Sequence, residues 1–263
     1  MQLLSLREAI STYVKDGGSL ALEGFTHLIR MTPDVVYDQL IGMGCAARLT
    51  FSWGGNPGVG SLHRLRDAVE RGWPQPLELA EFTHAEMAVA YQAGASGLPC
   101  GLLRRHAATD LTRVQGSAVR ALSCPFTNAG LALVPALTPD VTILHAQQID
   151  ARGNVLIRGI VGAAKEAAMA ARQVLVTAEE QVETRQADMN ALILPSWVIT
   201  AASIVPGGAY PSYAQGYYPR DNAFYLAWDE IARDRETFTA WMNRHVLGVS
   251  DHAALLRELG VAA

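Results

Sequence analysis

Short apolar segments rich in β-forming residues alternate along this chain with segments whose apolar residues recur at helical spacing. This alternation is typical of strands joined by crossover helices, because parallel neighbours cannot be connected by a tight turn. We therefore expect an α/β fold with an open, mostly parallel sheet and flanking helices. The strands are expected over residues 19–25, 48–53, 77–82, 141–147, 155–159, 174–180 and 191–198.

Capping patterns mark several helix starts. Ser5 and Glu8 have the spacing of a capping box, as do Thr83 and Glu86. Proline is favoured at the first position of a helix, so Pro33 is expected to begin another helix.

Length and composition fit one packed domain. The chain has 263 residues, of which half are hydrophobic and 17% are charged, so it can bury a full core. We expect a single domain over residues 1–263, with a helical, more polar portion from about residue 221. The net charge of -4 offers no basic surface, which argues against nucleic acid as a partner.

Cysteine usage and hydropathy predict the compartment. Cys45, Cys100 and Cys124 show no CxxC spacing and are odd in number, which suggests reduced, buried thiols. The opening segment MQLLSLREAI has charge within eight residues, so no signal peptide is predicted. Charged residues interrupt every apolar stretch. We expect a soluble cytoplasmic protein with no membrane partner.

Three of the expected strands lead into segments suited to ligand binding, namely GFTHLIR (24–30), GGNPGVG (54–60) and AEFTHAE (80–86). In an open parallel sheet, ligands bind beyond the carboxyl ends of the strands. Glycine-rich turns also let backbone N–H groups approach an anion or an oxyanion. GGNPGVG lacks the GxxxxGK[ST] pattern of a nucleotide loop. A tight strand-to-helix turn explains each segment equally well.

Several expected strands end on carboxylates. These are Glu23, Glu81, Glu179 and Glu180. A glutamate at such a position could act as a nucleophile or a base. The alternative is a solvated or hydrogen-bonded residue at the rim of the sheet.

Three histidines, His27, His84 and His145, are expected near the same rim. They lack the HExxH pattern or the i, i+4 pairing of a zinc site, so we expect no metal and predict structural or substrate-contact roles. A tyrosine cluster could line an acyl pocket, form a subunit interface or pack on the chain's own surface. It consists of Tyr210, Tyr213, Tyr217 and Tyr218.

The stretch DGGSLALEGFTH (16–27) resembles the N-terminal signature of family I coenzyme A transferases, which reads Asp-Gly, a short apolar strand and Gly-Gly-Phe. Glu23 stands where the first glycine of that pair usually lies, and Ile29 and Met31 replace a later glycine and proline. These departures point toward the glutaconate CoA-transferase-like branch. Further similarities to A-type subunits follow in sequence order and extend over nearly the whole chain. They are GGNPGVG, CPFT (124–127), DARGNVLIRG (150–159), VLVTAEEQV (174–182) and PGGAYPS (206–212).

The resemblance implies a mechanism and a partner. In such enzymes a glutamate of the B-type subunit, within a Ser-Glu-Asn-Gly-like segment, forms a glutamyl–CoA thioester and passes CoA to a small carboxylic acid. This chain has no such segment, which implies a separate B-type subunit. Coenzyme A and acyl-CoA would be substrates, and no permanently bound cofactor is implied.

The resemblance also nominates substrate-contacting residues. Gly24 and Phe25 would face the acyl group, with Thr26 and His27 beside them. A second set of candidates is the glycine-rich loop after the strand at 48–53. It comprises Gly54, Gly55, Asn56, Pro57 and Gly58.

Two alternatives remain open. Relatives with the same two-subunit fold hydrolyse a ring or C–C bond of an acyl-CoA with a glutamate of the A-type half, and Glu81 occupies a comparable place. A non-enzymatic acyl-CoA-binding module on a related sheet is the third hypothesis. The B-type partner distinguishes transfer from hydrolysis, because a nucleophilic glutamate in the partner favours transfer and its absence favours hydrolysis.

Overall fold

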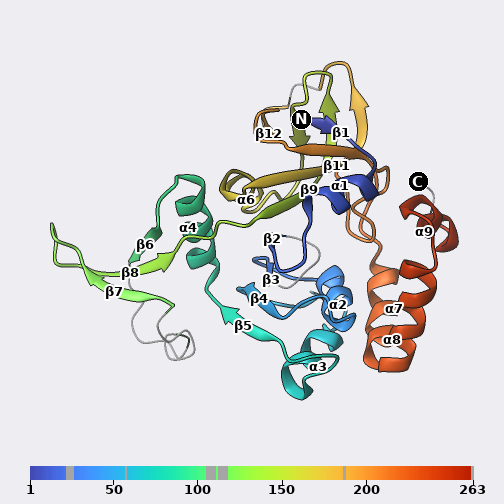
Figure 1. The fold of residues 1–263 in the computed structure, drawn as a ribbon, viewed down its shortest axis with the longest axis horizontal. Coiled ribbons are helices and arrows are strands. Elements are labelled where there is room, and N and C mark those ends of the chain that lie inside the picture. Colours follow the sequence, from blue (N-terminus) through green and yellow to red (C-terminus); the bar gives the residue numbers. More distant parts are fainter. Residues whose placement is uncertain (22–26, 57, 105–110, 112–117, 186–187, 262–263) are drawn as a thin grey trace.

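The computed structural model describes residues 1–21, 27–56, 58–104, 111, 118–185 and 188–261. In this part of the chain a ten-stranded sheet forms the centre of the molecule (Figure 1). Eight strands follow the order β1-β13-β11-β9-β2-β3-β4-β5, and each neighbouring pair is parallel. The expected α/β class with a mostly parallel open sheet is thus confirmed.

The strands of this sheet are short, apart from two at its centre. They span β1 Gln2–Leu3, β2 Ser19–Ala21, β3 His27–Ile29, β4 Arg48–Phe51, β5 Glu78–Glu81, β9 Val141–Asp150, β10 Val155–Ile157, β11 Gln173–Val182, β12 Leu192–Leu194 and β13 Ala201–Ile204. Strand β10 pairs antiparallel with both β9 and β12.

Helices cover both faces of the sheet. Within the described residues the helices are α1 Leu6–Tyr13, α2 Val35–Gly42, α3 His63–Arg71, α4 His84–Ala95, α6 Ala164–Ala170, α7 Asn222–Arg233, α8 Arg235–Met242 and α9 His252–Glu258, with a π-helical turn at Asn243–Leu247. Alternate residues of β9 and β11 pack on α6 and on α1, because side chains in a strand point to opposite faces. At the other end of the sheet, α2 and α3 pack on β3 and β4 in one cluster, and α4 packs with β3 in another.

The helix starts test the capping predictions. Both predicted capping boxes form, with Ser5 accepting from the Glu8 amide and Thr83 from the Glu86 amide. The prediction that Pro33 begins a helix is wrong, because α2 begins at Val35. The Pro33 carbonyl instead accepts the Gly55 amide at 3.2 Å, which ties this segment to the loop after β4.

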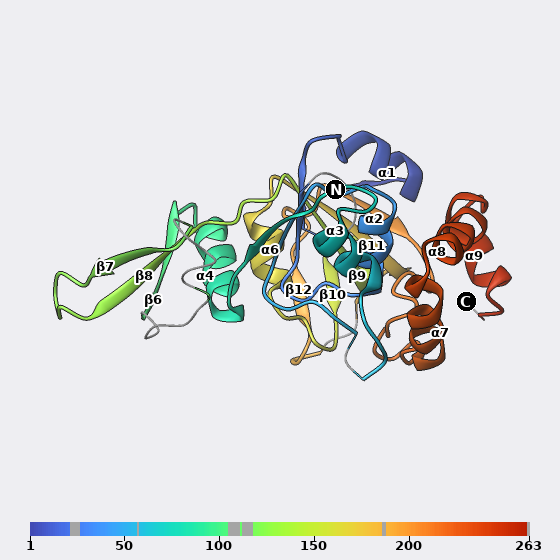
Figure 2. The ribbon, with the colours of Figure 1, turned by 90° about the horizontal axis from the view of Figure 1, so that it is seen from below.

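An arm of three antiparallel strands, which the sequence did not predict, projects from the body next to α4 (Figures 1 and 2). It consists of β6 Cys100–Arg104, β7 Arg120–Ser123 and β8 Gly130–Pro135, in the order β6-β8-β7. Cys124, just after β7, is half-buried, as are Cys45 and Cys100, so the prediction that these three thiols are buried is wrong. Because an arm beyond the main core has few residues to cover it, the side chain of Phe126 is 93% exposed.

Two further observations concern the described residues alone. None of the helices there is long and apolar enough to cross a membrane. The same residues contain no group of three or more His, Cys, Asp or Glu arranged to hold a metal ion.

Candidate functional site

The sheet order places a topological switch point between β9 and β2. From β2 the chain adds β3, β4 and β5 on one side, whereas β9, β11 and β13 extend the sheet on the other side. Such a reversal leaves a crevice at the carboxyl ends of the strands, where ligands bind in open α/β sheets. Strand β2 ends at Ala21, opposite Thr142, whereas β9 continues to Asp150.

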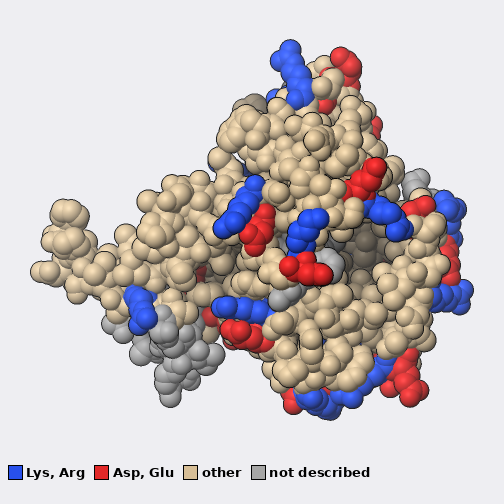
Figure 3. All heavy atoms as spheres, viewed as in Figure 1, with Lys and Arg blue, Asp and Glu red and all other residues tan. Residues whose placement is uncertain are grey.

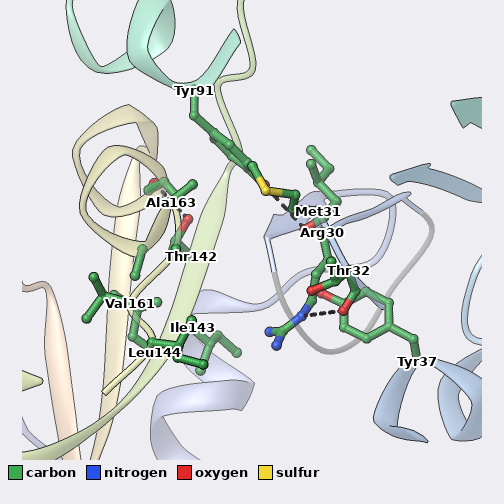
Figure 4. Close-up of a pocket in the computed structure, with 15 residues that line it drawn as sticks. Arg30, Met31, Thr32, Tyr37, Tyr91, Thr142, Ile143, Leu144, Val161 and Ala163 are labelled. Carbon is green, nitrogen blue, oxygen red and sulfur yellow. Dashed lines mark hydrogen bonds between the residues drawn. The ribbon is translucent and has the colours of Figure 1, made fainter. Parts of the chain in front are cut away.

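A cavity of about 270 Å³ lies at this point (Figure 4). One wall is Arg30, Met31 and Thr32, the three residues that follow β3. The opposite wall is strand β9 at 142–144 and the segment at 160–164 that leads into α6. The buried rings of Tyr37 on α2 and Tyr91 on α4 complete the lining.

A second cavity of about 280 Å³ adjoins the first. The two share five lining residues, namely Arg30, Leu144, Ile160, Val161 and Ala164. The second cavity extends to His145, to Arg158 and to the loop at 208–213. On the face drawn in Figure 3, basic and acidic side chains are interspersed around a hollow. We call the two adjoining cavities the cleft.

A hydrogen-bond network next to the second cavity holds the loop that follows β13. Glu179 on β11 accepts from the Gly207 amide at 2.7 Å and from the Tyr218 hydroxyl at 2.5 Å. His145 Nε2 lies 2.7 Å from the same carboxylate, and its Nδ1 lies 2.9 Å from Thr177 Oγ1. Because a carboxylate only accepts hydrogen bonds, Nε2 is the nitrogen that carries the proton.

The charge of Glu179 is stabilised although the residue is buried. Burial by itself raises the pKa of this carboxyl, but the hydrogen bonds from His145, Tyr218 and Gly207 outweigh burial and hold the pKa below its ordinary value. Glu180, the next residue, accepts from the Tyr217 hydroxyl at 2.6 Å and from Gln148 Nε2 at 2.9 Å. Two consecutive carboxylates of β11 thus anchor two consecutive tyrosines.

The four tyrosines of the predicted cluster form two pairs with different surroundings. Tyr210 and Tyr213 line the second cavity, where the Tyr213 hydroxyl accepts from the Ile160 amide at 3.0 Å. Tyr217 and Tyr218 bond to the glutamates of β11 and are not among the described residues that line the cleft.

The predicted turn after β2 falls on residues whose positions are not described. Gly24, Phe25 and Thr26 lie outside the described residues, as do Glu23 and Pro57. Their contact with an acyl group stays a prediction.

His27 does not lie at the carboxyl rim, so that prediction of its position is wrong. It is the first residue of β3, level with Ser19 of β2 and Arg48 of β4 at the amino ends of the strands. Its Nε2 lies 2.8 Å from Thr50 Oγ1, and burial lowers its pKa. We expected the segment at 24–30 to be a loop beyond the carboxyl end of a strand, but it contains strand β3 from His27 to Ile29. His27 therefore begins a strand, at the opposite edge of the sheet from the one predicted.

Glu81 and the glycine-rich loop lie at the carboxyl ends of the neighbouring strands β5 and β4. Glu81 is the last residue of β5, opposite Phe51, and is exposed. Gly54, Gly55, Asn56 and Gly58 follow β4, with Asn56 buried and Gly58 exposed at a positive φ of 74°. None of these five is among the described residues that line the cleft. Their contact with substrate remains a prediction.

Sequence reasoning missed Arg30, Tyr37, Tyr91 and most of the β9 wall as parts of the site. Arg30 was within the segment 24–30 that the glycine pattern singled out, but no local pattern distinguished it. The other residues come from distant parts of the chain, and only the strand order brings them together.

Comparisons with known proteins place this arrangement in a family. A model of the coenzyme A transferase family matches residues 73–202. The chain is 56% identical to the A-type subunit of 3-oxoadipate CoA-transferase from Pseudomonas knackmussii, over 95% of each chain. It is 28% identical to the A-type subunit of glutaconate CoA-transferase from Acidaminococcus fermentans, over 98% of this chain and 92% of the other.

Solved structures agree with these similarities. The crystal structure of glutaconate coenzyme A-transferase from Acidaminococcus fermentans matches with a TM-score of 0.89 and 25% identity, covering 99% of this chain and 93% of the other. A variant of the decarboxylase AibA/AibB matches with a TM-score of 0.74 and 27% identity, over 92% of this chain and 98% of the other. The chain therefore belongs to the coenzyme A transferase family, in its glutaconate CoA-transferase-like branch of A-type subunits.

Proposed function

We propose that this chain is the A-type half of a two-subunit enzyme that transfers coenzyme A from an acyl-CoA to a carboxylic acid, with 3-oxoadipate as the acceptor. The observation on which this rests is the 56% identity, over 95% of both chains, to the A-type subunit of a 3-oxoadipate CoA-transferase. The position of the cleft at the switch point of the sheet supports a ligand site in this chain.

The proposed chemistry divides one transfer into balanced steps. A glutamate carboxylate of the B-type partner attacks the thioester carbonyl, which gives an acyl-glutamyl anhydride and releases the CoA thiolate. The thiolate then attacks the glutamyl carbonyl, which gives a glutamyl–CoA thioester and frees the first acid. The acceptor acid takes the CoA by the same steps in reverse. Covalent catalysis keeps the free energy of the thioester bond within the enzyme.

The present chain would hold the acyl group and exclude water. The first cavity has apolar walls from Ile143, Leu144 and Val161, and its volume of about 270 Å³ is near the lower end of small-ligand pockets. It therefore suits an acyl group rather than a whole acyl-CoA. Exclusion of water matters because both the anhydride and the thioester hydrolyse.

The test is reconstitution with the B-type partner. We would co-express the chain with the adjacent reading frame, incubate the complex with succinyl-CoA, reduce with borohydride and map the peptides by mass. The expected result is CoA transfer to 3-oxoadipate and a reduced glutamyl residue on the partner. Full transfer by this chain alone, or release of free CoA with no adduct, contradicts the proposal.

The hydrolase and decarboxylase alternatives have distinct products. Glu81 would be the base of a ring- or C–C-cleaving hydrolase, but it is not among the described residues that line the cleft. Transfer is therefore preferred. Glu81→Gln should reduce transfer only modestly, whereas it should abolish a hydrolase. Release of CO₂ would indicate decarboxylation, and acyl-CoA binding without turnover with any partner would indicate a binding module.

A further inference from the structure

Asp34 is an acidic residue at the second cavity whose side chain the fold does not use. It occupies the N-cap position of α2 with extended backbone angles, but it makes no side-chain hydrogen bond to the first turn of that helix. A capping aspartate normally accepts from one of those amides. The half-buried Asp34 lines the second cavity, and its carboxylate has no hydrogen bond or ion pair with any other residue that the structure describes.

The buried Tyr225 lies near this carboxylate but does not pair with it. Tyr225 lines the same cavity. Burial is the largest cause that raises the pKa of its hydroxyl, and the charge of Asp34 raises the pKa further. The hydroxyl is hydrogen-bonded to Arg220 and Ser212 instead, so it leaves the oxygens of Asp34 to a ligand. A carboxylate in a cavity is poorly solvated and therefore gains more from a hydrogen-bond donor than one in water.

Tyr213 adds a donor to the same cavity. Its hydroxyl accepts from the Ile160 amide at 3.0 Å. A hydroxyl also has one proton to donate, and no described residue accepts that proton. The ring lies against Gly159, where φ is +95° and an added Cβ would come within 3.0 Å of the hydroxyl oxygen. The close approach of the Gly159 backbone therefore helps to fix this hydroxyl at the cavity.

The junction of the two cavities is mostly apolar. Apart from Arg30, the residues that line both cavities are Leu144, Ile160, Val161 and Ala164. Such a wall suits methylene groups rather than polar ones. A ligand that extends from the first cavity into the second would therefore place its polar groups beyond the junction, where Asp34 and Tyr213 lie.

We infer that the second cavity binds the amide of coenzyme A nearest the thioester, with Asp34 accepting from its N–H and Tyr213 donating to its C=O. The inference rests on the proposed function, in which the acyl group occupies the first cavity. In coenzyme A, methylene groups separate the sulfur from this secondary amide, so they match the apolar junction. A secondary amide has one donor and one acceptor, which match the two unused groups.

The experiment compares succinyl-CoA with an analogue in which an oxygen replaces this one N–H, using the reconstituted two-subunit complex. The analogue is an ester, so it keeps the carbonyl and lacks only the donor. For the wild type, kcat/KM should be on the order of 30-fold higher with succinyl-CoA, because a hydrogen bond to a charged acceptor is lost in the analogue. In Asp34→Ala the two substrates should become equivalent.

Tyr213→Phe tests the other half of the amide. It should lower kcat/KM for both substrates by about 10-fold and leave their ratio unchanged, because both keep the carbonyl. Asp34→Asn keeps an acceptor oxygen, so its ratio should be intermediate. This variant also serves as the test if Asp34→Ala does not fold.

Asp251→Ala is the matched control. Asp251 is also an N-cap residue, but it is exposed and caps α9 by accepting from the Ala254 amide at 2.8 Å. Its replacement should lower the thermal midpoint and leave the substrate ratio unchanged, whereas Asp34→Ala should remove the ratio with little change in the midpoint. A wild-type ratio in Asp34→Ala, or an unchanged kcat/KM in Tyr213→Phe, would overturn the inference.

Failure of the proposed function is distinguishable from failure of this inference. If the wild-type complex transfers CoA to no acid, calorimetry would compare the binding of coenzyme A with that of its ester analogue. Tighter binding of coenzyme A by the wild type, with no such preference in Asp34→Ala, supports the amide site even then. No preference in the wild type, or the same preference in both proteins, excludes it.

Discussion

His145 on β9 and Glu179 on β11 are joined across two neighbouring parallel strands, with Nε2 2.7 Å from Oε1. The pair lies directly below Gly208, where an added Cβ would come within 2.8 Å of the His145 ring. The backbone of the loop at 206–213 therefore rests on a charged, hydrogen-bonded support. Because this loop lines the second cavity, the support connects the core of the sheet to the candidate site.

Glu179→Gln should destabilise the chain and loosen this loop. The amide cannot keep all three accepted hydrogen bonds, because one of its terminal atoms is a donor. We expect a loss of about 1–3 kcal/mol in the free energy of unfolding and a rise in KM larger than the fall in kcat. Urea unfolding and steady-state kinetics with the B-type partner measure both. Glu183→Gln, at an exposed position just after β11, should change neither.

Tyr218 and Tyr217 offer a matched pair of hydroxyl deletions. The Tyr218 hydroxyl donates to Glu179 and accepts from the Ala209 amide at 2.9 Å, in a half-buried position. Tyr217 bonds to Glu180, but its side chain is exposed. Tyr218→Phe should therefore lower the free energy of unfolding by about 1–3 kcal/mol, and Tyr217→Phe by less. Equal losses in urea unfolding would show that burial does not distinguish the two hydroxyls.

Asp67 should contribute acid-sensitive stability. This buried carboxylate accepts from Arg235 at 2.6 and 2.8 Å, and the bond from Arg235 is the largest influence that lowers its pKa from 3.8 to about 2. Because the folded pKa is the lower one, the stabilisation is complete above the unfolded pKa and is lost as pH falls through the folded value. The shift corresponds to about 2 kcal/mol at neutral pH.

Asp67→Asn should remove this contribution, so its stability deficit should shrink between pH 4 and pH 2. Urea midpoints across that range provide the measurement. Glu70→Gln is the control, because the Arg66–Glu70 pair is exposed and contributes little. A deficit that stays constant with pH would contradict the assignment.

Cys124 should be the first of the three cysteines to react with a thiol reagent. Hydrogen bonds from the Thr127 side chain and from the backbone at Phe126 and Thr127 lower its pKa, whereas burial raises that of Cys45. Iodoacetamide labelling at pH 7.5 with peptide mapping reads out the order. Thr127→Val should slow the labelling of Cys124. If Cys45 is labelled first, this order is wrong.

Local patterns were sufficient for much of the fold. The capping boxes at Ser5 and Thr83 form as predicted, because they depend on side chains three residues apart. The strands predicted at 141–147 and 174–180 form within β9 and β11, because a strand that is buried on both faces begins with a run of mostly apolar residues. The arm could not be predicted in this way, because every residue of its strand β7 is exposed and no buried apolar run marks it.

The alternation of strand-like and helix-like segments in the sequence determined the α/β class, and the resemblance of its motifs to those of coenzyme A transferases indicated the family. Only the tertiary structure decided that Arg30 faces Leu144, and that His27 lies at the amino end of the strands. The physical reason is the order of the strands. A ladder pairs residues more than a hundred positions apart, such as Ala21 with Thr142, and no local pattern specifies which strands become neighbours.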